Sequence, residues 1–421
     1  MTEPTQTPPS TRSGAPDETT ARATPTLIKL DRPAGGIPPV VQTEHELLRV
    51  AELVAAGEGP VALDAERASG YRYSQRAYLV QLRREGSGSF LIDPVAVPDL
   101  RPINDAIGPA EWLLHAATQD LPCLAEVGLR PRQLFDTELA GRLLGLPRVG
   151  LAAVVEHYLG LALAKEHSAV DWSTRPLPEP WLLYAALDVE VLGELRNLMG
   201  VDLAAQGKAE WARQEFEALL TWEPTRKPEP WRRMSGMHKV RSARVAGVVR
   251  ELWEARDRIA RDRDIAVGRI IPDAPLMEVA QALPRDLSAL PTGTHRAVQR
   301  YGRHWVAAVE RGLALPEDEL PRLTVRSDGP PPPRAWDDRD PVAAARLAQT
   351  RERLGAFAAE RGIPIENLCS PDPLRRVVWT PPREETLTGF HDALTGLGCR
   401  PWQADVVAPL LVDAFRDHPR D

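Results

Sequence analysis

The spacing of apolar positions changes character along the chain. Residues 43–59 (TEHELLRVAELVAAGEG) repeat apolar side chains at helical intervals and end in glycine-rich turn material. Four short apolar runs then predict β-strands. These runs are PVALDAE at 60–66, AYLVQLRR at 77–84, SFLIDP at 89–94 and EWLLHAA at 111–117.

Helical patterns dominate after the fourth run. They are LPCLAEVG at 121–128, DTELAGRLLGL at 136–146, GLAAVVEHYLG at 150–160 and a long stretch at 179–200. Strands followed by flanking helices are typical of an α/β domain with a mixed sheet. We expect this domain to span residues 38–222.

The rest of the chain predicts helices and connecting segments. Residues 230–316 form one all-helical domain, in which VAGVVRELWEARDRIARDRDI keeps apolar side chains on one face and charges on the other. A proline-rich linker at 324–341 should be extended, and a second helical domain follows at 342–417. Residues 1–37, rich in Pro, Thr and Ser, predict a disordered tail.

The two helical domains contain similar stretches. IAVGRIIPDAPLMEVA, from Ile265, resembles IPIENLCSPDPLRRVV, from Ile363. Each has a Pro-Asp pair just before another proline, where a helix could begin. The spacing differs by one residue, and the pattern predicts an internal repeat.

Composition excludes several classes of protein. The 421 residues contain no apolar run near the roughly 20 that span a bilayer. The N-terminus lacks the basic and apolar regions of a secretory signal. The three cysteines are far apart in the sequence and predict neither disulfides nor a zinc site, so we expect a cytoplasmic protein.

Charge is unevenly distributed. Residues 225–315 hold 18 Lys/Arg and 10 Asp/Glu, a net of +8, whereas the whole chain carries −7. A basic segment beside an acidic remainder is what a nucleic-acid enzyme with a separate binding domain would show, although a solvated surface explains it equally well. Arg241, Arg244 and Arg250 are candidate nucleic-acid contacts within this segment.

Three stretches contain candidate catalytic acids. Asp64 and Glu66 alternate along a predicted strand, so they share one face about 7 Å apart. Asp120 begins a predicted helix, and Tyr184 and Asp188 lie one helical turn apart. Each has a simpler explanation: an exposed strand end, an N-cap aspartate, or a solvent-facing pair. His115 is expected to be a hydrogen-bonded core residue.

These stretches together resemble a known family. LDAE, HAATQDLPCL, FDTELAGRLLG and VDWSTRPLPEPWLLYAALDVEVL are similar, in this order, to ribonuclease D of the DEDD-type 3′–5′ exonuclease superfamily, in its tyrosine-bearing subclass. The resemblance covers about residues 38–222 and implies a ribonuclease H-like fold. The helical segments resemble tandem HRDC domains, the first clearly and the second more loosely.

The resemblance implies a role for each acid. Asp64, Glu66, Asp120 and Asp188 would bind two divalent metal ions, Mg²⁺ or Mn²⁺, and Tyr184 would hold the attacking water. Four carboxylates need such counter-charge, because like charges 4 Å apart cost about 4 kcal/mol at an effective dielectric near 20. The chain departs from the family pattern at Arg67, where an apolar residue usually packs on the terminal base; an arginine could stack or bind phosphate there.

The implied function is trimming of RNA from a free 3′ end to nucleoside 5′-monophosphates, in tRNA 3′ processing or stable-RNA maturation and turnover. No membrane and no nucleotide cofactor are expected as partners. Two alternatives stay open: the same chemistry on DNA, since helicase-linked exonucleases share these motifs, and a non-catalytic RNA-binding scaffold.

Overall fold

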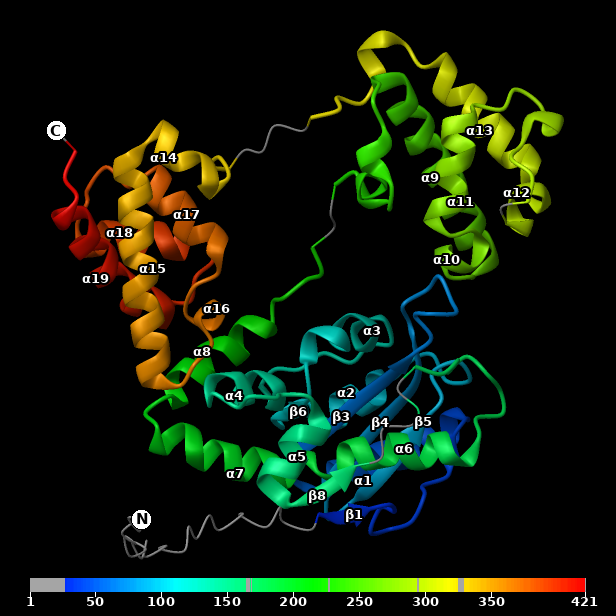
Figure 1. Cartoon of the computed structure of the whole chain (residues 1–421). Helices are drawn as coiled ribbons and strands as arrows, with labels where there is room; N and C mark the ends of the chain where they lie inside the picture. The colour runs from blue at the N-terminus through cyan, green and yellow to red at the C-terminus, as the bar shows by residue number, and fades with distance from the viewer. Residues whose placement is uncertain are drawn as a thin grey trace, which may run out of the picture.

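The computed structural model describes residues 27–163, 167, 169–225, 228–293, 295–324 and 329–420. Its first part is an α/β domain built on a six-stranded sheet, in the order β2-β5-β4-β3-β6-β7 (Figure 1). The strands are β2 (Val40–Val41), β3 (Glu58–Arg67), β4 (Ala77–Glu85), β5 (Gly88–Ile92), β6 (Trp112–Leu114) and β7 (Leu134–Asp136).

Strand β3 organises this sheet. It pairs antiparallel with β4 and parallel with β6, so both of its edges are hydrogen-bonded. Val61 and Leu63 on β3 are completely buried, as expected of an inner strand of a covered sheet. The four strands predicted from apolar runs are therefore confirmed as β3, β4, β5 and β6.

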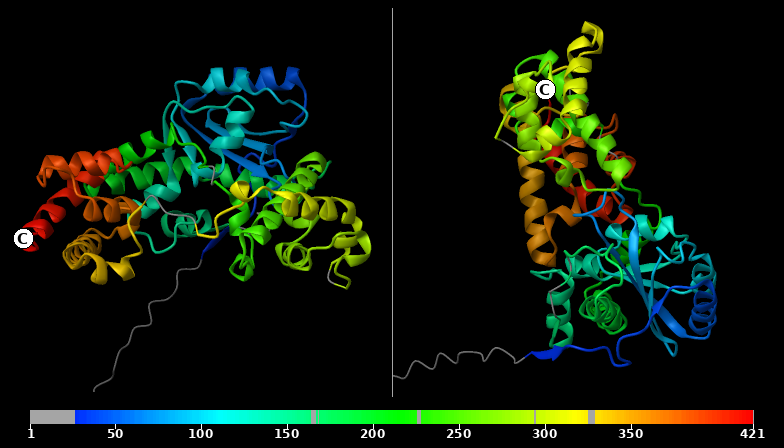
Figure 2. Two further views of the ribbon diagram at one scale, coloured as in Figure 1. Left: turned by 90° about the horizontal axis from the view of Figure 1, so that it is seen from above. Right: turned by 90° about the vertical axis from the view of Figure 1, so that its right-hand side faces the viewer.

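Helices cover both faces of the sheet. Figure 2 shows α1 on one side of the sheet and α6 on the other. Helix α6 packs across β3, β4 and β5, whereas α7 packs on β3 and β6. The helices of the domain are α1 (Glu44–Ala55), α2 (Arg101–Ile107), α3 (Leu121–Glu126), α4 (Thr137–Leu143), α5 (Leu151–Leu159), α6 (Glu179–Glu190), α7 (Leu192–Ala205) and α8 (Ala209–Leu219).

Two details of the α/β domain and of the tail before it differ from the sequence-based expectations. The stretch 179–200 forms two helices instead of one, with the break at Val191; both pack on β3, but α6 continues over β4 and β5 and α7 over β6. A second, two-stranded sheet pairs β1 (Ile28–Leu30) with β8 (Leu161–Leu163), so a strand lies within the predicted tail. Residues 1–26 of that tail lie outside the described residues.

The first helical domain comprises α9 to α13 and has its own apolar core. Its helices are α9 (Ala243–Arg263), α10 (Val267–Ile270), α11 (Asp273–Ala282), α12 (Arg296–Arg300) and α13 (Gly302–Ala314). Helices α9 and α13 pack along each other. Among the described residues, Tyr73 is the one apolar side chain of the α/β domain that packs against this core.

The second helical domain comprises α14 to α19. It begins inside the segment 324–341, so the prediction of an extended linker there is wrong for residues 333–339, which are helical and bury Trp336 in the core. This domain is attached differently from the first. Its core is continuous with that of the α/β domain. Trp211 of α8 stacks on Trp402 of α19, with ring centroids 4.6 Å apart. The helices are α14 (Trp336–Arg339), α15 (Pro341–Arg361), α16 (Ile365–Leu368), α17 (Pro371–Trp379), α18 (Leu387–Gly396) and α19 (Pro401–Asp417).

The two helical domains repeat one arrangement of elements. A 21-residue helix, a four-residue helix and a helix of nine or ten residues follow one another as α9, α10, α11 and again as α15, α16, α17. Buried tryptophans stand at matching places, Trp305 near the start of α13 and Trp402 near the start of α19. The geometry matches the predicted internal repeat.

The described part of the chain has no helix that combines the length and apolar character needed to cross a membrane.

A buried lysine joins the α/β domain to the second helical domain. Lys208 is 2 % exposed, and its Nζ donates to the carbonyls of Leu143, 2.7 Å away, and Arg361, 2.6 Å away. These carbonyls lie at the C-terminal ends of α4 and α15, where helices leave acceptors unpaired. The ammonium group therefore satisfies one helix end from each domain.

We expect Lys208→Met to lower the free energy of unfolding by about 1–3 kcal/mol, because both carbonyls lose their donor while the aliphatic stem keeps its packing. Urea denaturation followed by circular dichroism measures this. The matched control is Lys239→Met in the first helical domain. An equal loss in both variants would contradict the proposed role of Lys208.

Candidate active site

Strand β3 places the first two acids of the site. Asp64 and Glu66 alternate with buried Ala65, so their side chains lie on the face of the sheet that α6 covers. Glu66 is only 9 % exposed. A β-bulge follows between Glu66 and Arg67, where the strand leaves its regular pairing with β4.

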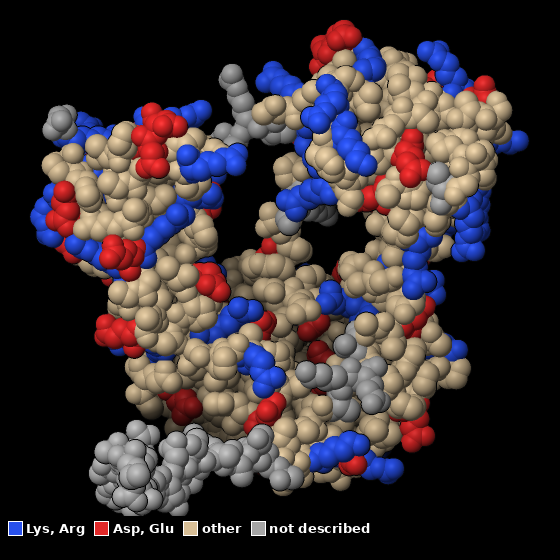
Figure 3. Space-filling model, in the orientation of Figure 1, with Lys and Arg blue, Asp and Glu red and all other residues tan. Residues whose placement is uncertain are grey.

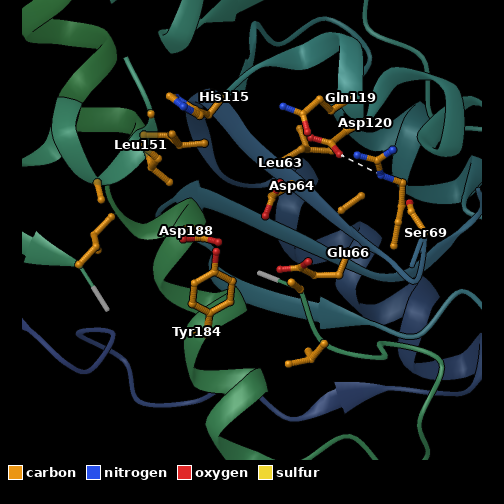
Figure 4. Close-up of a pocket in the computed structure, with 18 of the residues that line it drawn as sticks. Leu63, Asp64, Glu66, Ser69, His115, Gln119, Asp120, Leu151, Tyr184 and Asp188 are labelled. Carbon is orange, nitrogen blue, oxygen red and sulfur yellow. Dashed lines mark ion pairs between the residues drawn. The ribbon is translucent and has the colours of Figure 1, made fainter. Parts of the chain in front are cut away.

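Helix α6 brings a tyrosine and a third acid over these residues. One carboxylate oxygen from each of Asp64, Glu66 and Asp188 lies within 4.8 Å of the others. Tyr184, one helical turn before Asp188, forms a hydrogen bond with it. Figure 4 shows these four side chains pointing toward one another.

Asp120 approaches from the opposite side. It lies between a 3-10 turn (Ala117–Gln119) and α3, at the N-cap position of that helix. Its side chain makes no capping hydrogen bond; it lies close enough to Asp64 for the two carboxyl groups to share a hydrogen bond. The capping explanation of Asp120 is therefore wrong, and the structure brings all five predicted residues together.

Asp136 holds the corner that presents Asp120. Its buried carboxylate accepts hydrogen bonds from four backbone N–H groups at 2.8–3.1 Å, two from the corner and two from the start of α4. The corner includes Ala116 in the left-handed region, with φ of 60°, a conformation that costs energy without such support. Sequence reasoning missed Asp136 as a positioning residue, although it stands in the stretch FDTELAG.

The arginines predicted to bind nucleic acid have different surroundings. The Nε of Arg67 lies 3.9 Å from Asp120, at the edge of the cluster, and Figure 4 marks this ion pair. Arg241 is exposed. Arg244 donates to the carbonyls of Leu313 and Leu315 and pairs with Glu317, and Arg250 donates to a carbonyl of the same turn. Arg244 and Arg250 thus stabilise their own domain.

The acids oppose one another electrostatically. Burial raises the pKa of Asp64, Glu66, Asp120 and Asp188, and the charge of Asp64 raises the pKa of the other three further. Burial and the neighbouring carboxylates also raise the pKa of the Tyr184 phenol. The tyrosine hydroxyl therefore keeps its proton at neutral pH.

This donor set fits divalent cations. Hard cations such as Mg²⁺ bind carboxylate oxygens and retain several waters. Gln81, opposite Asp64 on β4, is fully buried, and neither atom of its amide has a hydrogen-bond partner in the described part of the chain.

The acids lie in a cleft of about 810 Å³, large enough for a nucleotide. Figure 3 shows acidic side chains recessed in a hollow of the α/β domain, with Lys and Arg around its margin.

His115 also lines the cleft, and its Nδ1 lies 2.8 Å from the Thr137 hydroxyl. The expected hydrogen bond of His115 is confirmed, and burial lowers its pKa to about 4, so the ring is neutral at pH 7.

Three family models match this chain. Residues 38–204 match a 3′–5′ exonuclease model, and residues 245–309 match the HRDC domain. Residues 329–415 match the model described as a 3′ to 5′ exonuclease C-terminal domain. One HRDC domain is thus identified by its own model, within the first helical domain.

Curated relatives are named ribonuclease D. The protein of Zymomonas mobilis is 32 % identical, covering 72 % of this chain and 83 % of its own length. That of Escherichia coli is 31 % identical, covering 67 % and 77 %. That of Gluconacetobacter diazotrophicus is 29 % identical and covers 85 % and 91 %.

Two solved structures are similar over most of the chain. A protein from Bifidobacterium adolescentis has a TM-score of 0.83 and 37 % identity, covering 93 % of this chain and all of its own. The RNase D of Escherichia coli, described as an exoribonuclease involved in structured RNA processing, has a TM-score of 0.66 and 26 % identity. It covers 91 % of this chain and all of its own.

We expect divalent cations to stabilise the protein more strongly as pH rises. The raised carboxyl pKa values mean that the metal-free folded state retains protons that the unfolded chain has released, so its stability falls as pH rises above the ordinary carboxyl range. Cation binding relieves this repulsion. At a hundred-fold excess over Kd, the gain is about 2.7 kcal/mol.

Thermal denaturation with Mn²⁺ or with EDTA measures this effect. The rise in Tm should be larger at about pH 8 than at about pH 5.5, because the ligands must be ionised. Asp64→Asn should abolish most of it, whereas the exposed control Asp99→Asn should not. A full shift in Asp64→Asn would contradict the assigned site.

We also expect Asp136→Asn to destabilise the corner that carries Asp120, because the new amide would direct an NH₂ group at backbone N–H donors. The expected loss in free energy of unfolding is about 1–3 kcal/mol. Denaturant titration measures it, and Asp99→Asn serves again as the control. Unchanged stability would show that the four hydrogen bonds are dispensable.

Proposed function

Because this chain belongs to the ribonuclease D family, we propose that its cleft binds the 3′ end of an RNA chain and that four carboxylates hold divalent cations there. The chain is a hydrolytic 3′–5′ exoribonuclease, as its similarity to ribonuclease D over most of both chains supports. The proposed metal ligands are Asp64, Glu66, Asp120 and Asp188. The observation that carries the proposal is the convergence of these acids with Tyr184 in one cleft.

Two divalent cations, when bound, supply Lewis acidity to both the attacking and the leaving oxygen of a phosphodiester. The protein contributes the carboxylates that would bind the cations. Its carboxylates come from β3, α6 and the corner before α3, so their spacing is fixed by three packed elements. Nucleoside 5′-monophosphates would be released from the 3′ end.

Tyr184 would orient the attacking water. Its hydroxyl keeps its proton at neutral pH and hydrogen-bonds to Asp188. The hydroxyl can donate to this carboxylate, which leaves its oxygen free to accept a hydrogen from water. This role corresponds to the tyrosine-bearing subclass of DEDD exonucleases.

The helical domains would help to hold structured RNA. The first helical domain contains the matched HRDC segment and lies within the basic part of the chain. We infer that the second is HRDC-like as well, because it repeats the order and length of the helices. Arg67 and Arg241 are the more available of the predicted contacts, because Arg244 and Arg250 bind their own domain.

The proposed substrates are tRNA precursors or other structured RNAs with a free 3′ end, acted on in the cytoplasm. Cleavage of DNA is the second candidate, because the same acids would act on any phosphodiester. Matched RNA and DNA oligonucleotides with free 3′ ends separate the two. Faster hydrolysis of DNA would overturn the RNA assignment.

We expect Asp64→Asn and Asp188→Asn to reduce kcat by at least about a hundred-fold while RNA binding persists, because each variant removes a metal ligand without removing the basic surfaces. Tyr184→Phe should reduce kcat by about 10²–10⁴-fold, the range for a lost positioning or proton-transfer group. The control is Tyr158→Phe, whose hydroxyl bonds Asp202 away from the cleft.

Digestion of 5′-end-labelled RNA, with and without EDTA, measures these effects. It reports the direction of cleavage, the need for metal and the size of the products. Undiminished turnover in Asp64→Asn or Asp188→Asn would refute the proposed site. Wild-type protein that binds RNA but never shortens it would instead favour the non-catalytic scaffold.

A further inference from the structure

The loop between β3 and β4, residues 68–76, forms part of the cleft wall. It begins immediately after Glu66 and Arg67, and Ser69, Gly70 and Tyr71 line the cleft beside the acids. Backbone hydrogen bonds from the N–H groups of Tyr71 and Arg72 to the Ala68 carbonyl fold its first half into a turn. Its position therefore affects the space available beside Glu66.

The first helical domain binds this loop through backbone groups. Nε of Arg269 donates to the Gly70 carbonyl at 2.7 Å, and the N–H of Ala266 donates to the Tyr71 carbonyl at 3.0 Å. The guanidinium of Arg269 also lies over the Tyr71 ring, 4.0 Å from its centroid. Two residues that line the cleft are thus held by the segment around α10.

Helix α9 binds the second half of the loop. The Tyr73 hydroxyl donates to Asp257 at 3.0 Å and lies 3.3 Å from Arg261. The N–H of Ser74 donates to Asp264 at 2.8 Å. In Figure 1 the loop extends from the sheet toward the end of α9 and α10.

These contacts are mostly polar, unlike the joint on the other side of the molecule. The second helical domain shares its apolar core with the α/β domain. The first has a separate core, to which the α/β domain contributes Tyr73 among the described residues. Its position relative to the cleft therefore depends on hydrogen bonds, on two cation–π contacts and on the packing of Tyr73.

We propose that the first helical domain positions the β3–β4 loop, so that it completes the wall of the catalytic cleft from outside the α/β domain. The inference rests on the proposed function of the cleft. The domain acts on turnover through Gly70 and Tyr71 as well as through any contact of its own with RNA. Arg269 and Tyr73 are positioning residues in this arrangement, because each acts through the loop.

Tyr71 gives this arrangement a consequence for substrate binding. Tyr71 lines the cleft, as Glu66 does, and its aromatic ring is held by Arg269. Aromatic side chains bind bases by stacking, largely without regard to sequence. We expect the positioned ring to contact the 3′-terminal nucleotide.

Arg269→Ala and Tyr73→Phe test the proposal. The first removes the hydrogen bond to Gly70 and the guanidinium over Tyr71, and the second removes one hydroxyl while keeping the ring in the core. Arg258→Ala is the matched control, because Arg258 lies on α9 beside Asp257, the partner of Tyr73, but pairs with Glu254 within its own domain. All three are made in the full chain.

Hydrogen–deuterium exchange of the loop is measured first, because it does not depend on activity. In Arg269→Ala and Tyr73→Phe, amides of residues 68–76 should exchange on the order of ten-fold faster, as the local opening free energy falls. Arg258→Ala should match the wild type. Unchanged exchange in both loop variants would overturn the proposal.

Kinetics on a short and a long RNA then distinguish positioning of the loop from direct binding of RNA by the first helical domain. Loss of positioning should lower kcat by a similar factor, on the order of ten-fold, on a five-nucleotide and a thirty-nucleotide RNA. If the domain only binds RNA directly, the loop variants would raise KM for the longer RNA and leave kcat and KM for the short RNA unchanged. This result would overturn the proposal. Wild-type protein that hydrolyses neither RNA refutes the proposed function instead, and the exchange experiment still reports on the loop.

Discussion

Repulsion between four buried carboxylates is the constraint on which the site depends. Burial raises the free energy of all four ionised forms, and the charge of Asp64 raises it further for the other three. Four carboxylates remain this close together only where rigid structural elements prevent them from moving apart. Inner strand β3 supplies two acids, helix α6 packs a third over them, and Asp136 holds the corner that presents the fourth. Such a site favours cation binding, because attraction between each carboxylate and a bound cation would offset the repulsion between the carboxylates.

The two helical domains are attached to the α/β domain in different ways, and only one of the attachments lies next to the acids. The second helical domain continues the core of the α/β domain and supports the sheet side on which α4 and α8 lie. The first helical domain instead binds the loop that leaves β3 just beyond the acids. Apolar burial suits a permanent joint, since its strength scales with area, whereas the contact of the first helical domain with the loop is small and mostly polar.

Part of this arrangement was predictable. The strands β3 to β6 follow from apolar runs, and the spacing of Asp64 with Glu66 and of Tyr184 with Asp188 follows from strand and helix geometry. Strand β7 was not predicted, because it runs directly into α4 and its last residue, Asp136, was assigned to the helical pattern at 136–146. The local pattern at Asp120 was ambiguous: an aspartate before a helix looks like a cap, and the absence of a capping hydrogen bond is visible only in the structure.

The sequence by itself determined which residues were available for chemistry and on which elements they lie, because periodicity and motif spacing are local properties. It did not determine how Asp136 supports its corner or how Arg269 reaches Gly70 across 199 positions. Those contacts join segments whose separation along the chain carries no information about their distance in space. Only packing of the sheet, its helices and the two helical domains brings them together, and with them the shape of the cleft.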